Sequence, residues 1–309
     1  MKLLSKSTQE NIQMHMYNRA RDIDAALLNC LYDEMPTSFI LDCLMFYQTK
    51  DGGFGSGLHI DNYNTNSSVY QIYEAYRLMD MVGLTCDCDH ELYDKIVNKS
   101  MNILYNREVL KNNKWNPNTK TNDSFAHAKD FSYSENFSEW GYAPTAALLG
   151  YTLIFNKPNK AYYKKALKMI EVMLKDFYQM NKLNKYEFIS FNSFLNSLKK
   201  SGEFKDEVCK VEAHLTNLAL ESVSLDFEDL EAIHPMDAAM YLNDPKLNEL
   251  KDKELDYIID SIEPHGLWEN KRSWGYNKYA EEDSAKLKWI GAQSINNLFI
   301  LKLHERLEK

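Results

Sequence analysis

His59 and Asp61 are the first residues whose types and spacing could support chemistry, because a carboxylate beside an imidazole can exchange protons with a bound molecule. They follow a Gly-rich turn, Gln48–Gly55, where we expect the chain to pass the mouth of a cavity. Asp61 would then act as a proton donor or acceptor. The alternative is that Asp61 only caps a helix or a loop.

Two further carboxylates stand at the entrances of predicted helices. Glu139 adjoins Trp140, and an aromatic neighbour that excludes water would favour the protonated acid. Asp237 follows His234 and Pro235 at the start of another predicted helix. The catalytic candidates are therefore Asp61, His59, Glu139 and Asp237. Against them stand a plain surface role for Glu139 and a capping role for Asp237.

Cys86, Cys88, Asp89 and His90 have the composition of a metal site. Ligands packed so closely along the chain rarely close the tetrahedron that zinc prefers. A polar loop that caps the following helix is the favoured interpretation. We therefore expect no metal and no cofactor.

Aromatic residues are the unusual part of the composition, with 20 Tyr, 14 Phe and 5 Trp. Aromatic faces can stabilise a carbocation by cation–π attraction, and they can also stack on sugar rings. A large helical core needs bulky side chains in any case, so we expect most of these rings to serve packing. The candidates for substrate binding are Trp140, Tyr73, Trp274, Tyr276 and Trp289.

Composition and charge exclude several classes of protein. The formal net charge of −9 provides no basic stripe for phosphates, so we expect no nucleic-acid partner. No apolar run is long enough to span a membrane, and no signal peptide is evident. Five cysteines without a secretory signal fit reduced thiols, which predicts a cytoplasmic protein. The expected partner is a small molecule, and nothing in the sequence specifies an oligomeric state.

The elements that must position these residues are helices, because only 11 Gly and 7 Pro punctuate the chain. Ser7–Glu10 forms a capping-box pattern that predicts a helix of roughly 20 residues. Asn66–Ser68 caps a second helix that begins at Val69. Small or apolar helices alternate with amphipathic ones, which indicates an inner and an outer layer. The further predicted helices cover residues 38–47, 89–105, 143–151, 160–180, 187–200, 206–220, 232–241, 247–262 and 284–307.

The Gly-rich turn is interpreted as a packing device. Glycines permit positive φ after a helix, so the aromatic ring of Phe54 can fold back while the Gln48 amide bonds to backbone groups. A weaker copy of the order helix, polar residue, Gly, aromatic occurs at Glu263–Trp268, with Glu263 in the place of Gln48. We interpret the pair as a degenerate repeat, with chance similarity as the alternative.

These motifs carry a resemblance to a known family. The Gly-rich turn is similar to the QW-type repeat of squalene–hopene cyclases and of prenyltransferase β subunits. More closely, the chain resembles a bacterial group of terpenoid-cyclase-like α/α toroid proteins of unassigned function. The pieces that match are Arg21–Ala26, Gln48–Gly55, Leu58–Asp61, Ser67–Ser68, Trp140, Ala143–Ala146 and Lys288–Gly291.

The resemblance implies an all-α fold, an (α/α)6 toroid in which residues 1–309 form a single domain around a central cavity. The chain departs from the family at His59 and Ile60, where that group usually has Glu and Pro. It also lacks the complete Asp-x-Asp-Asp acid motif of the cyclases, since Asp87–His90 ends in His. No Asp-rich magnesium motif of the class I terpene synthases is evident.

Three hypotheses about function remain open. The first is a terpenoid-cyclase-like or prenyltransferase-like protein that binds or transforms an apolar isoprenoid by acid chemistry. The second is a protein that acts on or binds carbohydrate, for which two carboxylates facing a polar groove are expected. The third is a non-catalytic binding or scaffold protein, for which a cavity filled by side chains is expected.

Overall fold

The protein is almost entirely helical. The computed structural model describes residues 1–309 except 33–34, 109 and 276–278. Within this part of the chain a single two-stranded hairpin, β1 (Leu110–Lys111) with β2 (Lys114–Trp115), is the only sheet. The helices are α1 (Lys6–Arg19), α2 (Asp22–Leu31), α3 (Phe39–Met45), α4 (Val69–Met81), α5 (Glu91–Asn102), α6 (Thr145–Phe155), α7 (Ala161–Phe177), α8 (Lys185–Ser201), α9 (Lys205–Ser222), α10 (Pro235–Ala239), α11 (Pro245–Asp260) and α12 (Glu281–Leu303).

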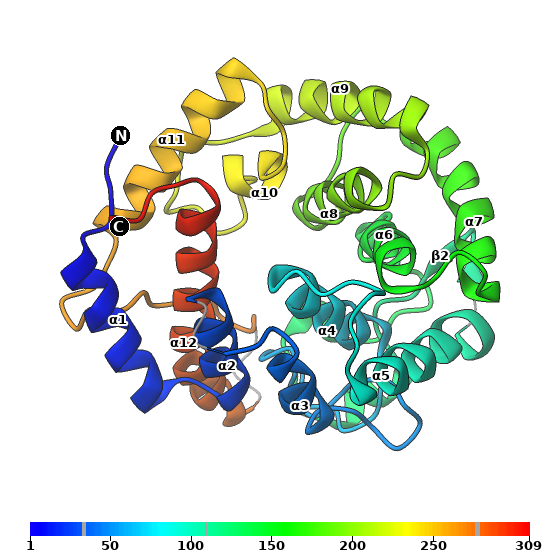
Figure 1. Ribbon diagram of the computed structural model, residues 1–309, viewed down its shortest axis with the longest axis horizontal. Coiled ribbons are helices and arrows are strands. Elements are labelled where there is room, and N and C mark those ends of the chain that lie inside the picture. The colour runs from blue at the N-terminus through cyan, green and yellow to red at the C-terminus, as the bar shows by residue number, and fades with distance from the viewer. Residues whose placement is uncertain (33–34, 109, 276–278) are drawn as a thin grey trace.

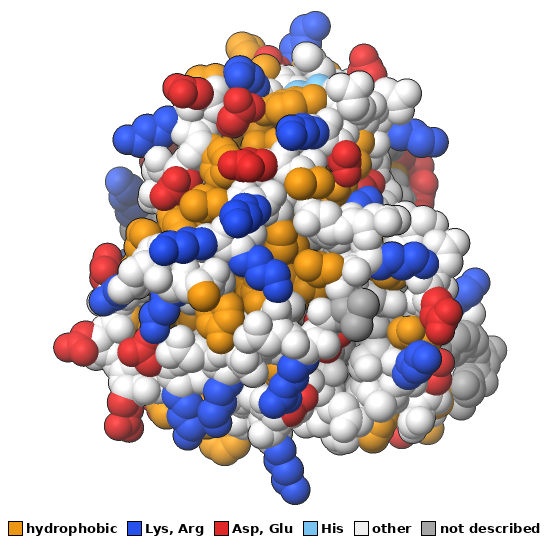
Figure 2. All heavy atoms as spheres, turned by 90° about the vertical axis from the view of Figure 1, so that its right-hand side faces the viewer, with side chains coloured by type: hydrophobic (Ala, Val, Ile, Leu, Met, Phe, Trp, Pro, Cys, Tyr) orange, Lys and Arg blue, Asp and Glu red, His pale blue; other side chains and the backbone are white. Residues whose placement is uncertain are grey.

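The helices follow one another around the molecule (Figure 1). Along its edge lie α7, α9 and α11, whereas α6, α8, α10 and α12 lie nearer the middle. Burial agrees with this order, because every residue of α6 is buried, whereas α7 buries one face only. The predicted alternation of apolar and amphipathic helices is confirmed for this pair. The exposed side of the molecule around α7 carries several Lys and Arg side chains among apolar ones (Figure 2).

The two ends of the chain lie side by side. The Leu4 N–H donates to the Arg306 carbonyl at 2.8 Å, and the Glu308 N–H donates to the Leu4 carbonyl at 3.0 Å. The Arg306 side chain is only 1% exposed and donates to the carboxylates of Asp252 and Asp256, both on α11. This seam, formed by Leu4, Arg306 and Glu308, fastens the start of the chain to the end of α12 and to α11.

The Gly-rich turn has the predicted packing. The Gln48 side-chain amide donates to the Gly52 carbonyl at 3.1 Å, and Phe54 is fully buried. Gly52 has a φ of +99°, which a residue with a side chain rarely adopts. The turn is closed by the Thr49 N–H donating to the Gly53 carbonyl.

The turn at Glu263–Trp268 contains the same backbone hydrogen bonds as the first turn. Its residues align with the first turn one position away from the predicted alignment. The Glu263 N–H donates to the Leu267 carbonyl, and the Gly266 N–H donates to the Glu263 carbonyl. These bonds match those of Thr49, so Glu263 corresponds to Thr49 and not to Gln48. The buried Trp268 then takes the place of Phe54, and its Nε1 donates to the Ile258 carbonyl in the last turn of α11 at 2.7 Å.

The first predicted helix is divided into α1 and α2. Its N-cap is Ser5, whose Oγ accepts from the Thr8 N–H, and the predicted capping box at Ser7–Glu10 is wrong. The chain is extended at Ala20 and Arg21, where the Arg21 guanidinium turns to the Gly57 and Leu58 carbonyls. The Ser68 cap of α4 is confirmed, since its Oγ accepts from the Gln71 N–H. Among the described residues no helix combines the length and apolarity needed to cross a bilayer.

Substitution of Gly53 by Ala should destabilise the fold, because the added Cβ would overlap the Cβ of Ser67 and approach Ile103. We expect a loss of about 1–3 kcal/mol in the free energy of unfolding, as for an overpacked core. Chemical denaturation of Gly53→Ala, Ser67→Gly and the double variant measures this effect. The double variant should recover part of the loss, and a Gly53→Ala protein as stable as the parent would contradict the expectation.

Candidate functional site

Two adjoining cavities lie between the inner helices. The larger has a volume of about 740 Å³, the smaller about 250 Å³, and Tyr73, Arg77 and Trp289 line both. The larger cavity alone has the size of an ordinary small-molecule site. Side chains from α4, α6, α8, α10, α11 and α12 form its wall.

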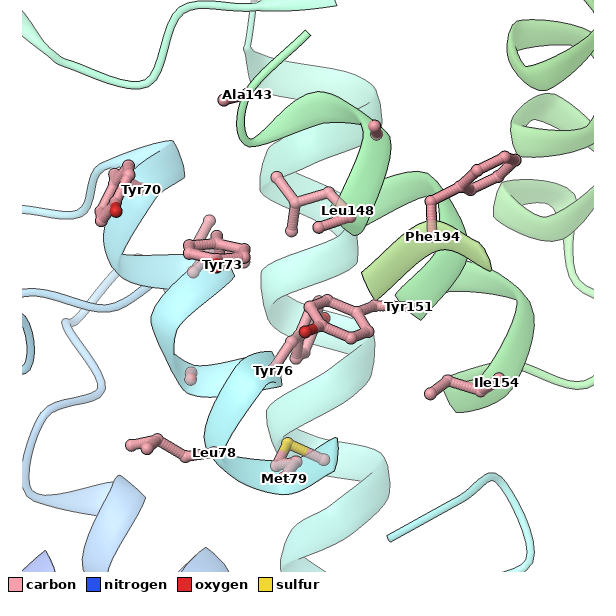
Figure 3. Packing of buried hydrophobic residues seen from close by; sticks show 14 of the residues in the cluster. Tyr70, Tyr73, Tyr76, Leu78, Met79, Ala143, Leu148, Tyr151, Ile154 and Phe194 are labelled. Carbon is pink, nitrogen blue, oxygen red and sulfur yellow. The ribbon is translucent and has the colours of Figure 1, made fainter. Parts of the chain in front are cut away.

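Helix α4 contributes side chains to both cavities, as do α8 and α12. Tyr70 and Tyr73 lie on successive turns, with Tyr151 on the neighbouring α6 (Figure 3). The Tyr73 and Tyr151 rings stack with their centroids 6.3 Å apart. Tyr76, on the same helix, instead bonds to Ser100 through its hydroxyl and belongs to the core. Tyr73, one of the predicted binding aromatics, lines both cavities.

Asp61 is brought together with two of the predicted aromatic residues. The indole Nε1 atoms of Trp274 and Trp289 both donate to Oδ1 of Asp61, each at 2.7 Å. Asp61 is 8% exposed, and its backbone carbonyl accepts from the Ala128 N–H. This carboxylate fixes the positions of both indoles. Neither cavity includes Asp61 in its wall.

His59 is held beside this cluster. Its Nδ1 accepts from the Asp61 backbone N–H at 3.3 Å, so the proton of the neutral ring resides on Nε2. The ring packs on Phe131 and Trp289, with centroids 4.7 Å and 5.8 Å away. Burial lowers the pKa of His59 below its ordinary value, against the opposing charge of Asp61. His59 lines the smaller cavity as a neutral imidazole.

Two further residues that the sequence predicted for the site, Trp140 and Glu139, are not found in the wall of either cavity. Trp140 is buried between Tyr70 and Tyr186, with ring centroids 5.4 Å and 5.0 Å away, and lines neither cavity. Glu139 is solvent exposed and lines neither cavity, in agreement with its surface interpretation. Tyr276 lies outside the described residues.

Asp237 caps a helix and faces the larger cavity at the same time. Its Oδ2 accepts from the His234 N–H at 3.1 Å and lies 3.1 Å from Nζ of Lys185. The capping interpretation is therefore confirmed, and the ion pair with Lys185 keeps one positive group beside the carboxylate. Asp237 lines the cavity at the head of α10.

Glu254, which the sequence did not single out, lies beside Asp237. It comes from α11, is 8% exposed, and its Oε2 accepts from the Met236 N–H at 2.7 Å. Burial, with a further contribution from the charge of Asp237, raises the pKa of Glu254 to about 8. At neutral pH this carboxyl holds a proton. No sequence signal marks it, because an isolated Glu in a Lys-rich amphipathic helix is typical of a solvated face.

Glu254 and Asp237 form a pair with divided roles. A carboxyl that keeps its proton beside a carboxylate held by a cation is the arrangement that acid–base chemistry uses. Both groups face the same cavity, and both are fixed by backbone N–H donors at the head of α10. The arrangement can therefore deliver one proton and accept another within a single site.

The wall of the larger cavity is mostly apolar, and its charged groups include more acids than bases. Amide and hydroxyl groups of Asn192, Ser193, Gln293, Asn296 and Asn297 lie among its aromatic rings. Its basic residues are Arg77, Lys185, Lys271 and Arg272, and its acidic residues are Asp80, Glu228, Asp237, Glu254, Asp260, Glu263 and Glu269. The wall therefore attracts neutral or positively charged groups.

The Cys86–His90 segment behaves as a cap. His90 precedes α5, and its Nδ1 accepts from the Leu92 N–H at 3.3 Å. Across the described residues no group of three or more His, Cys, Asp or Glu side chains is arranged to hold a metal ion. The polar-loop interpretation of this segment is confirmed.

Comparisons of the chain with protein-family models, with curated proteins and with solved structures find no match. The resemblance to terpenoid-cyclase-like toroids thus stays a prediction from short motifs. Function has to be inferred from the geometry of the two cavities.

Substitution of Asp61 by Ala should leave two indole N–H groups without their acceptor. We expect a loss of about 1–3 kcal/mol of unfolding free energy for each indole left unsatisfied. Near-ultraviolet circular dichroism should lose tryptophan signal in the same variant. Asp283→Ala, at a side chain that is 91% exposed, is the matched control and should leave both measurements unchanged. Equal stability of the two variants would contradict the anchoring role.

Glu254 should make stability depend on pH. Its pKa is raised in the fold from 4.5, so the folded state favours the protonated form and loses stability as pH rises from about 4.5 to about 8. Each unit of pKa difference corresponds to about 1.4 kcal/mol. Glu254→Gln removes this dependence, so its stability relative to the parent should increase between pH 5 and pH 8.

The measurement is chemical denaturation at a series of pH values. Glu249→Gln, on the same helix at a side chain that is 71% exposed, provides the control. A stability difference between parent and Glu254→Gln that stays constant over this range would contradict the assignment.

Proposed function

We propose that the helices form an (α/α)6 toroid around the two cavities. Three observations support this arrangement. Buried and half-exposed helices alternate along the chain, α6 with α7 being the clearest pair. The turns after α3 and α11 repeat the same backbone hydrogen bonds. The seam between Leu4 and Arg306 brings the first and last helices together, as ring closure requires.

We further propose that the larger cavity binds a polyhydroxylated ring compound, such as a saccharide. Flat aromatic faces and a few fixed polar groups are what a sugar ring needs from its site. Trp289, Tyr73 and Tyr151 supply the rings, and Asn296 and Gln293 supply amide groups. Part of the wall's charge is already paired, since Lys185 bonds to Asp237 and Arg77 bonds to Glu74.

An isoprenoid ligand, the first hypothesis from the sequence, is less well supported by this wall. An apolar chain would cover Asn, Gln and carboxylate groups without hydrogen-bonding to them, which is unfavourable. The excess of acidic residues also repels a diphosphate from the larger cavity. The aromatic rings and the aliphatic side chains of the wall, such as Ile189, Met240 and Ile300, favour the isoprenoid.

Glu254 and Asp237 carry the proposed chemistry. In this proposal Glu254 donates its proton to a leaving oxygen, and Asp237, ionised beside Lys185, accepts a proton from water or stabilises developing positive charge. The position of this pair in the cavity wall is the single observation on which the enzymatic hypothesis depends. A binding protein without activity is the alternative.

The experiment has a binding part and a catalytic part. Calorimetric titration with neutral oligosaccharides and with prenyl diphosphates identifies the ligand class, and we expect the oligosaccharides to bind. For an oligosaccharide that is turned over, Glu254→Gln and Asp237→Asn should each reduce turnover by about 10²–10⁴-fold while binding is retained. Glu249→Gln should leave both unchanged.

Each outcome has a distinct meaning. Binding of prenyl diphosphates alone would overturn the saccharide proposal in favour of the isoprenoid hypothesis. Binding without turnover, unaffected by either substitution, would support the non-catalytic alternative. Absence of binding by both groups would contradict a ligand-binding function as stated.

A further inference from the structure

The smaller cavity contains hydroxyl groups that the proposed chemistry does not use. Tyr70 and Tyr73 are 9% and 4% exposed, and both line this cavity. Neither hydroxyl has a hydrogen-bond partner within the described part of the chain. Figure 3 shows the two side chains on neighbouring turns of α4. Burial raises the pKa of both phenols above the ordinary value, so both remain donors at physiological pH.

A third donor lies beside them. The His59 ring is in edge-to-face contact with Tyr70, with centroids 5.2 Å apart. Its Nδ1 is already engaged by the Asp61 N–H, which leaves the Nε2 proton available. Two phenols and one imidazole thus provide three hydrogen-bond donors to one small space.

The carboxylates around the smaller cavity are already occupied. Asp24 accepts from Nε and Nη2 of Arg21, both at 2.8 Å. Glu74 accepts from Nε and Nη2 of Arg77 at 3.0 Å and 2.8 Å. Such bidentate pairing neutralises each acid and leaves little acceptor capacity toward the cavity.

Two more cations reach this wall. Lys185 and Arg272 line the smaller cavity, and their carboxylate partners, Asp237 and Asp130, lie outside its wall. The four bases that the structure describes in this wall are therefore all paired with carboxylates, namely Arg21, Arg77, Lys185 and Arg272. The two phenols and the imidazole remain as donors without a partner among the described residues, and three donors facing one small space fit the several acceptor lone pairs of an oxyanion.

We propose that the smaller cavity is a subsite for an oxyanion, and that the ligand is a saccharide with a carboxylate or phosphate group at one end. The oxyanion accepts from Tyr70, Tyr73 and His59, while the neutral rings occupy the larger cavity. The identity of those rings rests on the proposed function; the oxyanion subsite rests on the smaller cavity alone.

Calorimetric titration with three probes tests the proposal. The probes are cellobiose, cellobiouronic acid and glucose 6-phosphate, which are neutral, carboxylated and phosphorylated. The parent protein should bind at least one anionic probe more tightly than cellobiose. The stronger of the two anionic probes distinguishes a carboxylate from a phosphate subsite.

Variants locate the subsite. Tyr70→Phe/Tyr73→Phe keeps both rings and removes both hydroxyls, so the preference for the anionic probe over cellobiose should fall by about tenfold or more. Tyr76→Phe is the matched control on the same helix, because its hydroxyl bonds to Ser100 in the core. Thermal unfolding of each variant verifies that the fold is retained.

Failure of the subsite and failure of the proposed function give different results. Equal binding of neutral and anionic saccharides, or a preference that survives loss of both hydroxyls, would overturn the subsite and leave the saccharide proposal in place. Binding of inorganic phosphate that is lost in Tyr70→Phe/Tyr73→Phe, with no binding of the three saccharide probes, would overturn the saccharide proposal and support the subsite. Absence of binding by inorganic phosphate and by all three saccharide probes would contradict both.

Discussion

One carboxylate oxygen, Oδ1 of Asp61, joins three parts of the chain that are far apart in the sequence. It holds the loop after the first Gly-rich turn, the segment around Trp274 and helix α12 through Trp289. Trp289 is also a wall of both cavities, so the position of that wall depends on this shared acceptor. The same loop places His59, whose Nδ1 accepts from the Asp61 backbone. The shape of the smaller cavity therefore follows from a single buried anchor.

Local signals in the sequence were sufficient for much of the fold. The Ser68 cap, the buried α6 and the packing of the Gly-rich turn depend on residues close together in the chain, and the structure contains all three. The break between α1 and α2 was missed because the apolar spacing continues through it. What ends α1 is the Arg21 side chain, whose acceptors lie near residue 57. Contacts between residues so far apart in the chain produce no periodic pattern in the sequence.

The site was predictable only in part, for a related reason. His59 and Asp61 were predicted at a cavity mouth, and Trp274 and Trp289 were predicted as binding aromatics. The hydrogen bonds that Asp61 accepts from the two indoles connect positions more than 200 residues apart. Glu254 could not be found at all, because its environment is made by Met236 and Asp237 of another helix. Glu139 was selected for its aromatic neighbour, yet the fold directs that carboxylate to solvent. Residue type and spacing identify candidate site residues, but burial in the folded protein determines which of them face a cavity.

The seam between Leu4 and Arg306 has a consequence for chain entropy. Closing a loop of this length costs on the order of 5 kcal/mol, against much less for each neighbouring pair of helices. Successive helices can therefore assemble on one another with local contacts, and the seam forms when nearly the whole chain is already ordered. The same asymmetry makes the seam the place where the fold opens most easily, because the chain regains the entropy of its ends while the packing of other helix pairs is left intact.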